Sequence, residues 1–243
     1  MNHIIHLNKT PAIIAGVLFF LSLGLTAKAQ DAVIQSDFEH KINLYNVNGK
    51  PLTNGDIDVA GNPYFQTAWR YGLVQIKGSA PFDNIPMRLD LQSQQLHFKN
   101  SKNEEIVIMA GAVREVSLYD SSTALRRVYT FRSGFPAIDN QNENNFYMVL
   151  SDGKLQMLKS MRKQINVDHD QLSGETRKEF RLYEDYYFFS QGQIQRIKKD
   201  KSFVLALMGD KQVQVNQFLS TNKVSFKSMD DINKLVEYYN SLK

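Results

Sequence analysis

Apolar and polar residues alternate along most of the chain, from about Ile42 to Ile197. Between Ile85 and Leu91 every second residue is large and apolar, and the residues between them are proline or charged. Successive side chains of a β-strand point to opposite faces, so this pattern predicts a strand with one buried face. The same alternation predicts further strands at Trp69–Ile76, Gln95–Lys99, Glu105–Met109, Val113–Tyr119, Arg127–Phe131, Phe146–Leu150, Lys154–Met161, Phe180–Phe189 and Gln193–Ile197.

Short polar turns separate several of these predicted strands. Ser151–Gly153 and Gln191–Gly192 have the length of turns that join two strands into a hairpin. A parallel connection needs a dozen or more residues, so short turns make neighbouring strands antiparallel. We therefore expect an antiparallel β-meander of about nine or ten strands, with polar loops at Asp139–Asn145 and at residues 167–178.

The hydrophobic pattern changes near the C-terminus from a period of two to the helical period of about 3.6. Ser228 stands three residues before Asp231, which is the spacing of a helix N-cap and its acidic partner. Apolar residues then lie on one helical face up to Leu242. Two shorter helices are expected before this one, after Asp200 and after Asp210.

The first residues of the chain have the order of a secretory signal peptide. A basic start is followed by an apolar run from Ala12 to Leu25 and by an A-x-A site that ends at Ala29. The apolar run is shorter than the roughly 20 residues that a membrane-spanning helix needs. We therefore expect cleavage between Ala29 and Gln30, and an exported mature chain, periplasmic or secreted, without a transmembrane helix.

Together these patterns predict an α+β fold that is mainly β. Residues 1–29 form the cleaved signal peptide, residues 30–197 form a β-rich body, and residues 198–243 form a helical C-terminal segment. We expect two or three short helices to pack on the antiparallel meander, and both parts to belong to one domain.

Composition excludes several kinds of chemistry. The 243 residues include no cysteine, which excludes disulfides, thiolate catalysis and cysteine-ligated metals. Lysine and arginine number 29 against 25 acidic residues, and the resulting net charge of +4 is too small and too scattered to indicate a nucleic-acid partner.

Motifs give no positive indication of an active site or a cofactor. The chain has no phosphate-binding glycine loop, no metalloprotease motif and no serine-nucleophile elbow. His40, His97 and His169 each stand alone in the sequence. A segment from Asp56 resembles a calcium loop but lacks two of its oxygen ligands, and Asp168–Asp170 fits a solvated loop. We therefore expect no cofactor and no metal.

The densest aromatic cluster lies between Phe180 and Phe189. Aromatic residues favour half-buried strands, so residues of one parity are expected to face the core. These are Phe180, Leu182, Tyr186 and Phe188. The candidate contact surface consists of the two tyrosines of the opposite parity and the acids between them: Tyr183, Tyr187, Glu184 and Asp185.

Four blocks of the chain carry a resemblance to a family. They are the segment Gly61–Phe65 with Trp69 after it, the stretch Ile85–Lys99, and two blocks near the C-terminus, Ile197–Lys211 and Ser225–Leu242. This combination resembles exported proteins of Bacteroidota-type bacteria that have no established activity. The resemblance spans most of the mature chain, and it implies export but no catalytic residue.

Three hypotheses for the function follow from these observations. The first is a non-catalytic exported protein of the periplasm or cell envelope, with a binding or structural role toward an envelope protein or a glycan. The second is a carboxylate-based hydrolase of envelope or extracellular glycans, for which two acids must meet in a cleft. The third is a small outer-membrane barrel, which the helical C-terminus and the lack of an aromatic girdle disfavour. The acids to consider for the second are Glu184, Asp185, Glu115 and Asp90.

Overall fold

A computed structural model of the chain describes residues 59–109, 111–120, 127–169, 171–172 and 174–242. The predicted signal peptide, its cleavage point between Ala29 and Gln30, and the first part of the calcium-loop-like segment lie outside the described residues.

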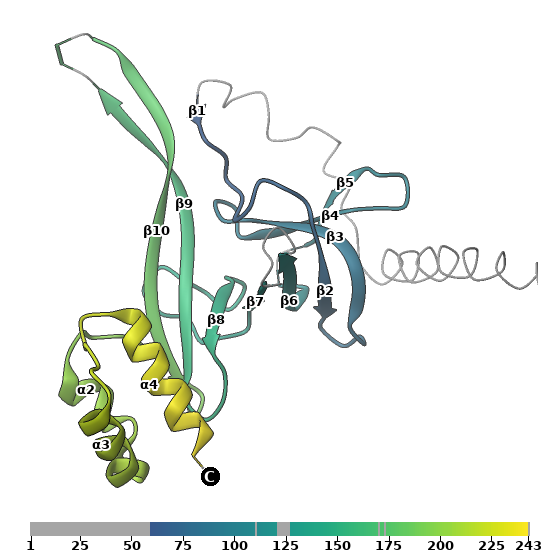
Figure 1. Cartoon of the computed structure of the whole chain (residues 1–243). Helices are drawn as coiled ribbons and strands as arrows, with labels where there is room; N and C mark the ends of the chain where they lie inside the picture. Colours follow the sequence, from purple (N-terminus) through teal and green to yellow (C-terminus); the bar gives the residue numbers. More distant parts are fainter. Residues whose placement is uncertain (1–58, 110, 121–126, 170, 173, 243) are drawn as a thin grey trace, which may run out of the picture.

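Eleven strands form one sheet, which is antiparallel except where β1 pairs with β10 (Figure 1). Neighbours across the sheet follow the order β1-β10-β9-β8-β7-β6-β2-β3-β4-β5, and β11 also pairs with β10. The strands are β1 (Val59–Ala60), β2 (Arg70–Ile76), β3 (Phe82–Asp90), β4 (Gln95–Lys99), β5 (Glu105–Val107), β6 (Val113–Asp120), β7 (Arg127–Arg132), β8 (Tyr147–Ser151), β9 (Gln156–His169), β10 (Thr176–Ser190) and β11 (Gln193–Arg196).

The predicted fold class, mainly β with short C-terminal helices, is confirmed. The sheet consists of two meanders, β2 to β5 and β6 to β11, because β6 returns to pair with β2 instead of continuing from β5. Hydrophobic alternation identifies strands and short turns identify hairpins, but neither pattern shows which edge a strand joins after a longer connection.

Three short α-helices and a single 3-10 turn follow β11. The carboxylate of Asp200 accepts a hydrogen bond from the N–H of Phe203 (2.9 Å), and the hydroxyl of Ser228 accepts one from the N–H of Asp231 (3.3 Å). The two helices that follow Asp200 and Ser228 therefore begin where these capping residues predict. The elements are α2 (Lys201–Ala206), η1 (Gly209–Lys211), α3 (Gln212–Thr221) and α4 (Met229–Ser241).

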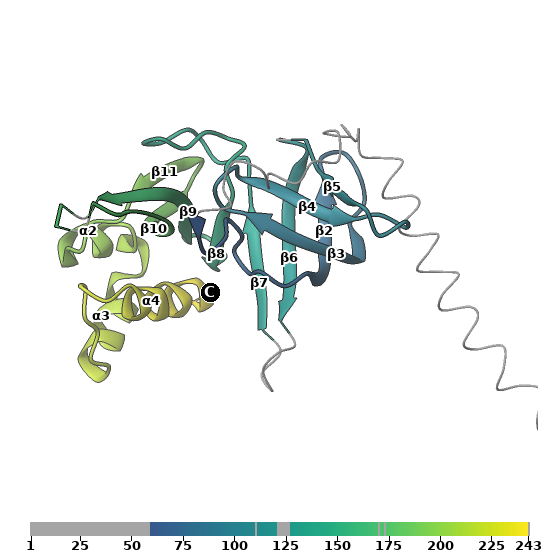
Figure 2. The same ribbon diagram turned by 90° about the horizontal axis from the view of Figure 1, so that it is seen from above.

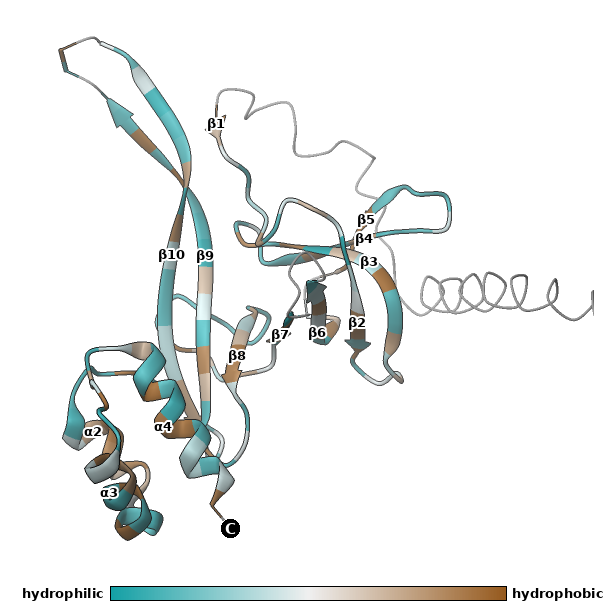
Figure 3. Ribbon diagram, viewed as in Figure 1, coloured by the Kyte–Doolittle hydropathy of each residue, from teal (hydrophilic) through white to brown (hydrophobic). Residues whose placement is uncertain are grey.

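Buried side chains form three clusters. The largest lies between the strands β2 to β7, where β3 and β4 cross over β6 and β7 in Figure 2. A second joins the helices to the base of β9 and β10, and the apolar stripe of α4 faces these strands in Figure 3. The third is mainly aromatic and lies on the opposite face of that base; its buried members are Phe135, Tyr147, Leu158 and Tyr187.

Gln94, in the turn between β3 and β4, ties the first meander to the second. Its amide nitrogen donates to the carbonyl oxygens of Leu91 and Met161, each at 3.0 Å, and its amide oxygen accepts from the N–H of Phe146 at 3.2 Å. These bonds satisfy backbone groups beyond the regular ladder, and they hold the edge of β3 against β9.

The segment at residues 167–178 is a correction to the sequence analysis, which predicted a polar loop there. In the structure β9 continues to His169 and β10 begins at Thr176, with these two residues paired opposite each other. Polar residues occur in these strands because both faces of the hairpin reach solvent at this point, so neither face requires apolar side chains.

Asn240 fastens α4 to the turn between β8 and β9. Its amide oxygen accepts from the N–H of Leu155 (3.1 Å), and its amide nitrogen donates to the carbonyl oxygens of Leu155 (2.8 Å) and Asp152 (3.1 Å). Gly153 in the same turn has a φ of 138°, and a Cβ there would lie 2.7 Å from the Cγ of Asn240. The turn therefore approaches Asn240 this closely because residue 153 is a glycine without a Cβ, and Asn240 supplies the hydrogen bonds.

We predict that Asn240→Ala lowers the free energy of unfolding by about 1–3 kcal/mol, because the backbone groups of the turn lose their partners at a partly buried site. Urea unfolding followed by circular dichroism measures the change. The matched control is Asn216→Ala, which alters an exposed asparagine of α3 and should stay within about 0.5 kcal/mol of the parent. Equal losses in both variants would contradict the assigned role.

Candidate functional site

The hairpin of β9 and β10 is the most prominent surface feature of the molecule. Its two strands, of 14 and 15 residues, pair continuously from Gln156 opposite Phe189 to His169 opposite Thr176. The base lies between buried clusters, whereas the outer part projects beyond the remainder of the sheet (Figure 1). We call this outer part the arm, and it consists of Lys163–His169 and Thr176–Leu182.

The root of the arm is fixed by Lys163. Its ammonium group donates to the carbonyl oxygens of Asn62 (2.9 Å) and Tyr64 (2.7 Å), and its backbone N–H donates to the carbonyl of Leu91 (3.1 Å). Burial lowers the pKa of Lys163, and the nearby negative charge of Asp90 opposes this shift. These contacts hold the arm at its root while the outer residues remain exposed.

One face of the arm is apolar. Residues directly opposite each other in an antiparallel pair point to the same face, and Ile165 lies opposite Phe180. On the same face Val167 is 56% exposed and Leu182 is 43% exposed. Lys163 and Lys178 share this face, and the acidic residues of the arm do not. The residues of the face are Lys163, Ile165, Val167, His169, Thr176, Lys178, Phe180 and Leu182.

The opposite face of the arm is polar and carries both signs of charge. The guanidinium of Arg181 donates to Asp168 (3.1 Å) and to Glu179 (2.7 Å), and the amide of Asn166 donates to Asp168 (2.8 Å). All of these groups reach solvent, so each ion pair adds little to stability. The arm is therefore amphipathic, with its acids segregated from its apolar face.

The residues of the predicted contact surface have different environments. Tyr183 is 38% exposed, next to the arm. Glu184 accepts a hydrogen bond from Lys159 at 3.1 Å. Asp185 accepts from Arg162 at 2.7 Å and also from Arg196.

Tyr187 is fully buried, so the expectation that it lies on an exposed surface is wrong. Its hydroxyl donates to Asp139 at 2.8 Å, and its ring meets that of Tyr147 edge to face at 5.5 Å. Burial raises the pKa of Tyr187, and the hydrogen bond to Asp139 adds to this shift. Burial likewise raises the pKa of Tyr147 to about 12. Both phenols therefore stay protonated, as in a packed core.

Parity also predicts a buried Leu182, and this expectation is wrong as well, because Leu182 lies on the arm. At the base of the hairpin both faces are covered, with Phe188 against the helices and Tyr187 against the aromatic cluster. Leu182 lies on the same face of β10 as Phe188. It is farther along the strand, beyond the helices, and is therefore exposed. Alternation along a strand cannot show where the covering layer ends.

Each of the acids considered for hydrolysis is engaged by other groups. Glu184 and Asp185 bind lysine and arginine side chains, and they lie on opposite faces of β10. Glu115 accepts from Arg132 at 2.7 Å. Asp90 is fully buried, and one of its oxygens accepts from the N–H groups of Gln92 and Ser93, at 2.7 and 3.0 Å. The four acids considered for hydrolysis come from three different strands.

An ionic cluster at β3, β4 and β5, buried at Asp90 and His97 and partly exposed at Glu105, was not identified from the sequence. His97, only 4% exposed, lies with Nδ1 2.6 Å from an oxygen of Glu105, and Nε2 4.0 Å from an oxygen of Asp90. Arg88 donates to both oxygens of Glu105, each at 2.7 Å, and its guanidinium stacks over the ring of Tyr64 at 3.7 Å. These side chains come from three neighbouring strands, so no local motif marks them.

Burial by itself would raise the pKa of Glu105, but hydrogen bonds from His97 and Arg88 outweigh it and hold the pKa at about 2, against the usual 4.5.

We predict that Glu105 stabilises the fold at neutral pH and loses this effect in acid. The folded state binds the proton of Glu105 less readily than the unfolded state, so the stabilisation is complete above about pH 4.5 and disappears as the pH falls toward 2. Glu105→Gln should reduce the pH dependence of unfolding in this range by about 1–2 kcal/mol, allowing for partial exposure of the carboxylate.

The control for this experiment is Glu104→Gln, which changes the exposed neighbour of Glu105. Thermal unfolding between pH 2 and pH 6 compares the two variants with the parent. If both variants follow the parent curve, the assigned electrostatic role of Glu105 is wrong.

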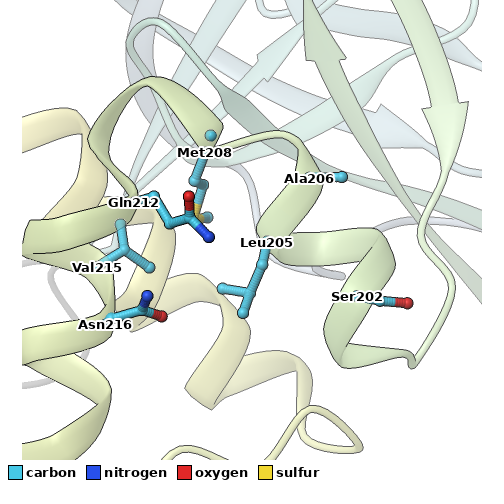
Figure 4. Close-up of a pocket in the computed structure, with 8 residues that line it drawn as sticks. Ser202, Leu205, Ala206, Met208, Gln212, Val215 and Asn216 are labelled. Atoms are coloured by element: carbon cyan, nitrogen blue, oxygen red, sulfur yellow. The ribbon is translucent and has the colours of Figure 1, made fainter.

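Two concave regions lie away from the arm. The first, of about 360 Å³, lies between α2 and α3, and Figure 4 shows Leu205, Met208 and Val215 directed into it. The second is a groove of about 590 Å³ that crosses the sheet at the ends of β2, β6, β7, β9 and β10. The first is lined by apolar and amide side chains, whereas the groove contains several charged groups.

Within the described ranges, no set of three or more histidine and acidic side chains lies close enough to hold a metal ion. Among the same residues, no helix combines the length and hydrophobicity needed to cross a membrane.

Comparisons of the chain with protein-family models, with curated proteins and with solved structures gave no match. The resemblance to exported bacterial proteins therefore remains a prediction.

Proposed function

We propose that this protein is a non-catalytic binding protein of the cell envelope that holds a protein partner through the apolar face of its arm. The observation that carries the proposal is the amphipathic β9–β10 arm. Val167 of β9 and Leu182 of β10 are both exposed on its apolar face. Export to the periplasm or beyond is part of the same proposal, and it rests on the signal-peptide pattern at residues 1–29.

A protein partner suits the arm for energetic reasons. β1 pairs with the arm at Lys178 and Glu179, and among the described residues the rest of the arm has two strands. A two-stranded hairpin is marginally stable in water, and exposed apolar side chains such as those of the arm are a feature of interaction sites. Leu182 is 43% exposed, so covering its exposed part contributes about 1 kcal/mol, a fraction of the value for burying a whole leucine side chain. A partner with a matching apolar surface therefore stabilises both the contact and the arm.

The charges on the arm limit the chemistry of that partner. Lys163 and Lys178 lie on the apolar face, whereas Asp168 and Glu179 lie on the opposite one. A partner surface that has acidic residues around an apolar centre complements this distribution. We therefore expect binding to weaken as ionic strength rises.

We predict that a photoreactive residue at position 182 cross-links to a defined envelope protein in living cells, whereas one at position 181, on the polar face, does not. With the identified partner purified, Val167→Ser/Leu182→Ser should weaken binding by about 30-fold, which corresponds to about 2 kcal/mol of lost apolar burial. Titration calorimetry measures the affinity.

The matched control is Gln164→Ser/Asn166→Ser, which makes the same number of changes on the polar face and should leave the affinity within about threefold. Lys178→Glu tests the charge requirement. The loss of affinity that it causes should be larger at low salt than at high salt. Equal cross-linking from positions 181 and 182, or equal affinities of the two double variants, would refute binding through the apolar face.

We predict that the exported chain begins at Gln30. Ala29→Arg places a large charged residue at the cleavage site and should leave the precursor uncut, whereas Gln35→Arg, beyond the site, should be processed normally. Cell fractionation with intact-mass measurement distinguishes the two. A full-length chain that remains in the cytoplasm would overturn the localisation while leaving the arm as a binding surface.

A further inference from the structure

The groove across the sheet has a fixed ionic floor. Arg132 of β7 donates through Nε to Glu115 (2.7 Å) and through a terminal nitrogen to Asp152 (2.9 Å). The hydrogen bond to Asp152 raises the pKa of Arg132, and the same bond lowers the pKa of Asp152. These bonds hold all three side chains in position, and each carboxylate keeps further lone pairs that accept from a ligand hydroxyl.

Two further cations line the groove. Lys77 follows β2 and Arg114 lies in β6, and both side chains are exposed. Neither forms an ion pair with any residue that the structure describes. With Arg132 they give three positive charges against the two negative charges of Glu115 and Asp152, so the lining carries a net positive charge.

Two aromatic rings and two amides also line the groove. Phe189 of β10 is half-buried and is supported by Phe135, whose ring centre lies 5.0 Å away. Gln75 and Gln156 contribute side-chain amides. The amide oxygen of Gln156 is buried and has no hydrogen-bond partner among the described residues.

We propose that this groove binds an acidic oligosaccharide built from uronic acids. A ligand carboxylate pairs with Lys77 and Arg114, and ring hydroxyls donate to Glu115 and Asp152. The apolar face of one sugar ring packs against Phe189. Fixed charges and amides beside the aromatic rings suit a polyhydroxylated anion better than an apolar ligand, and the volume is within the range of small-ligand sites.

The ionic floor also indicates binding without cleavage. Glycoside hydrolysis needs one carboxyl group that stays protonated to act as the acid. Here Arg132 bonds to both carboxylates, and its hydrogen bond to Asp152 lowers the pKa of Asp152, which disfavours the protonated form that an acid needs. The groove is separate from the arm, so this inference and the proposed function can fail independently.

Calorimetry on the purified protein at low salt tests the proposal with three probes: oligomers of galacturonate, of alginate and of glucuronate-containing hyaluronan. At least one should bind, and its methyl ester, which keeps the sugar skeleton and removes the charge, should bind at least tenfold more weakly. Lys77→Gln/Arg114→Gln should cause a similar loss for the acid form. Phe189→Leu should weaken the binding of the acid and of the ester by equal factors, because it removes the ring contact and no charge.

The control is Lys102→Gln/Arg127→Gln, which removes two exposed basic residues, one from the turn between β4 and β5 and one from the start of β7. It should bind as the parent does, and melting curves establish that all variants are folded. Failure of all three oligouronates to bind, equal binding of acid and ester, equal loss in the control, or binding of inorganic phosphate as tight as that of the oligomer would each overturn the assignment.

Discussion

The continuous antiparallel ladder between β9 and β10 is the interaction on which the remainder of the structure depends. Near its base, residues of the same two strands contribute to all three buried clusters. Met157 and Phe188 meet the helices, Leu158 and Tyr187 join the aromatic cluster, and Met161 reaches the large core between β2 and β7. Because one hairpin supplies all of these contacts, its backbone pairing fixes the relative positions of the helices and both meanders.

Polar side chains complete the connections that the ladder begins. Gln94 joins the first meander to β9, Asn240 joins α4 to the turn before β9, and Lys163 joins the root of the arm to the segment before β2. In each case the side chain satisfies backbone groups for which regular strand pairing leaves no partner. The extension of the hairpin beyond its buried base is therefore supported at its root, which a free hairpin lacks.

The arm and the groove are different kinds of surface, and they suit different partners. The arm offers exposed apolar side chains with lysines and with its acids turned away, which fits a protein surface. The groove offers fixed ions, amides and aromatic rings on a strand framework, which fits a small polar ligand. A protein that holds an envelope protein with one surface and a glycan with the other would connect the two, without any need for a catalytic group.

The sequence by itself determined the local elements. Alternation at Ile85–Leu91 identified β3, and the capping side chains of Asp200 and Ser228 identified the starts of α2 and α4, because each signal depends on residues within a few positions. The same alternation occurs at Gln164–Asp168, where β9 continues into the segment predicted as a loop. Only the tertiary structure decided that Tyr187 is buried, that Leu182 is exposed and that Arg132 lies between Glu115 and Asp152. The period of the pattern shows which side chains lie on the same face of an element. Whether that face is buried, and what its side chains pair with, depends on the layer that covers it. That layer comes from distant parts of the chain.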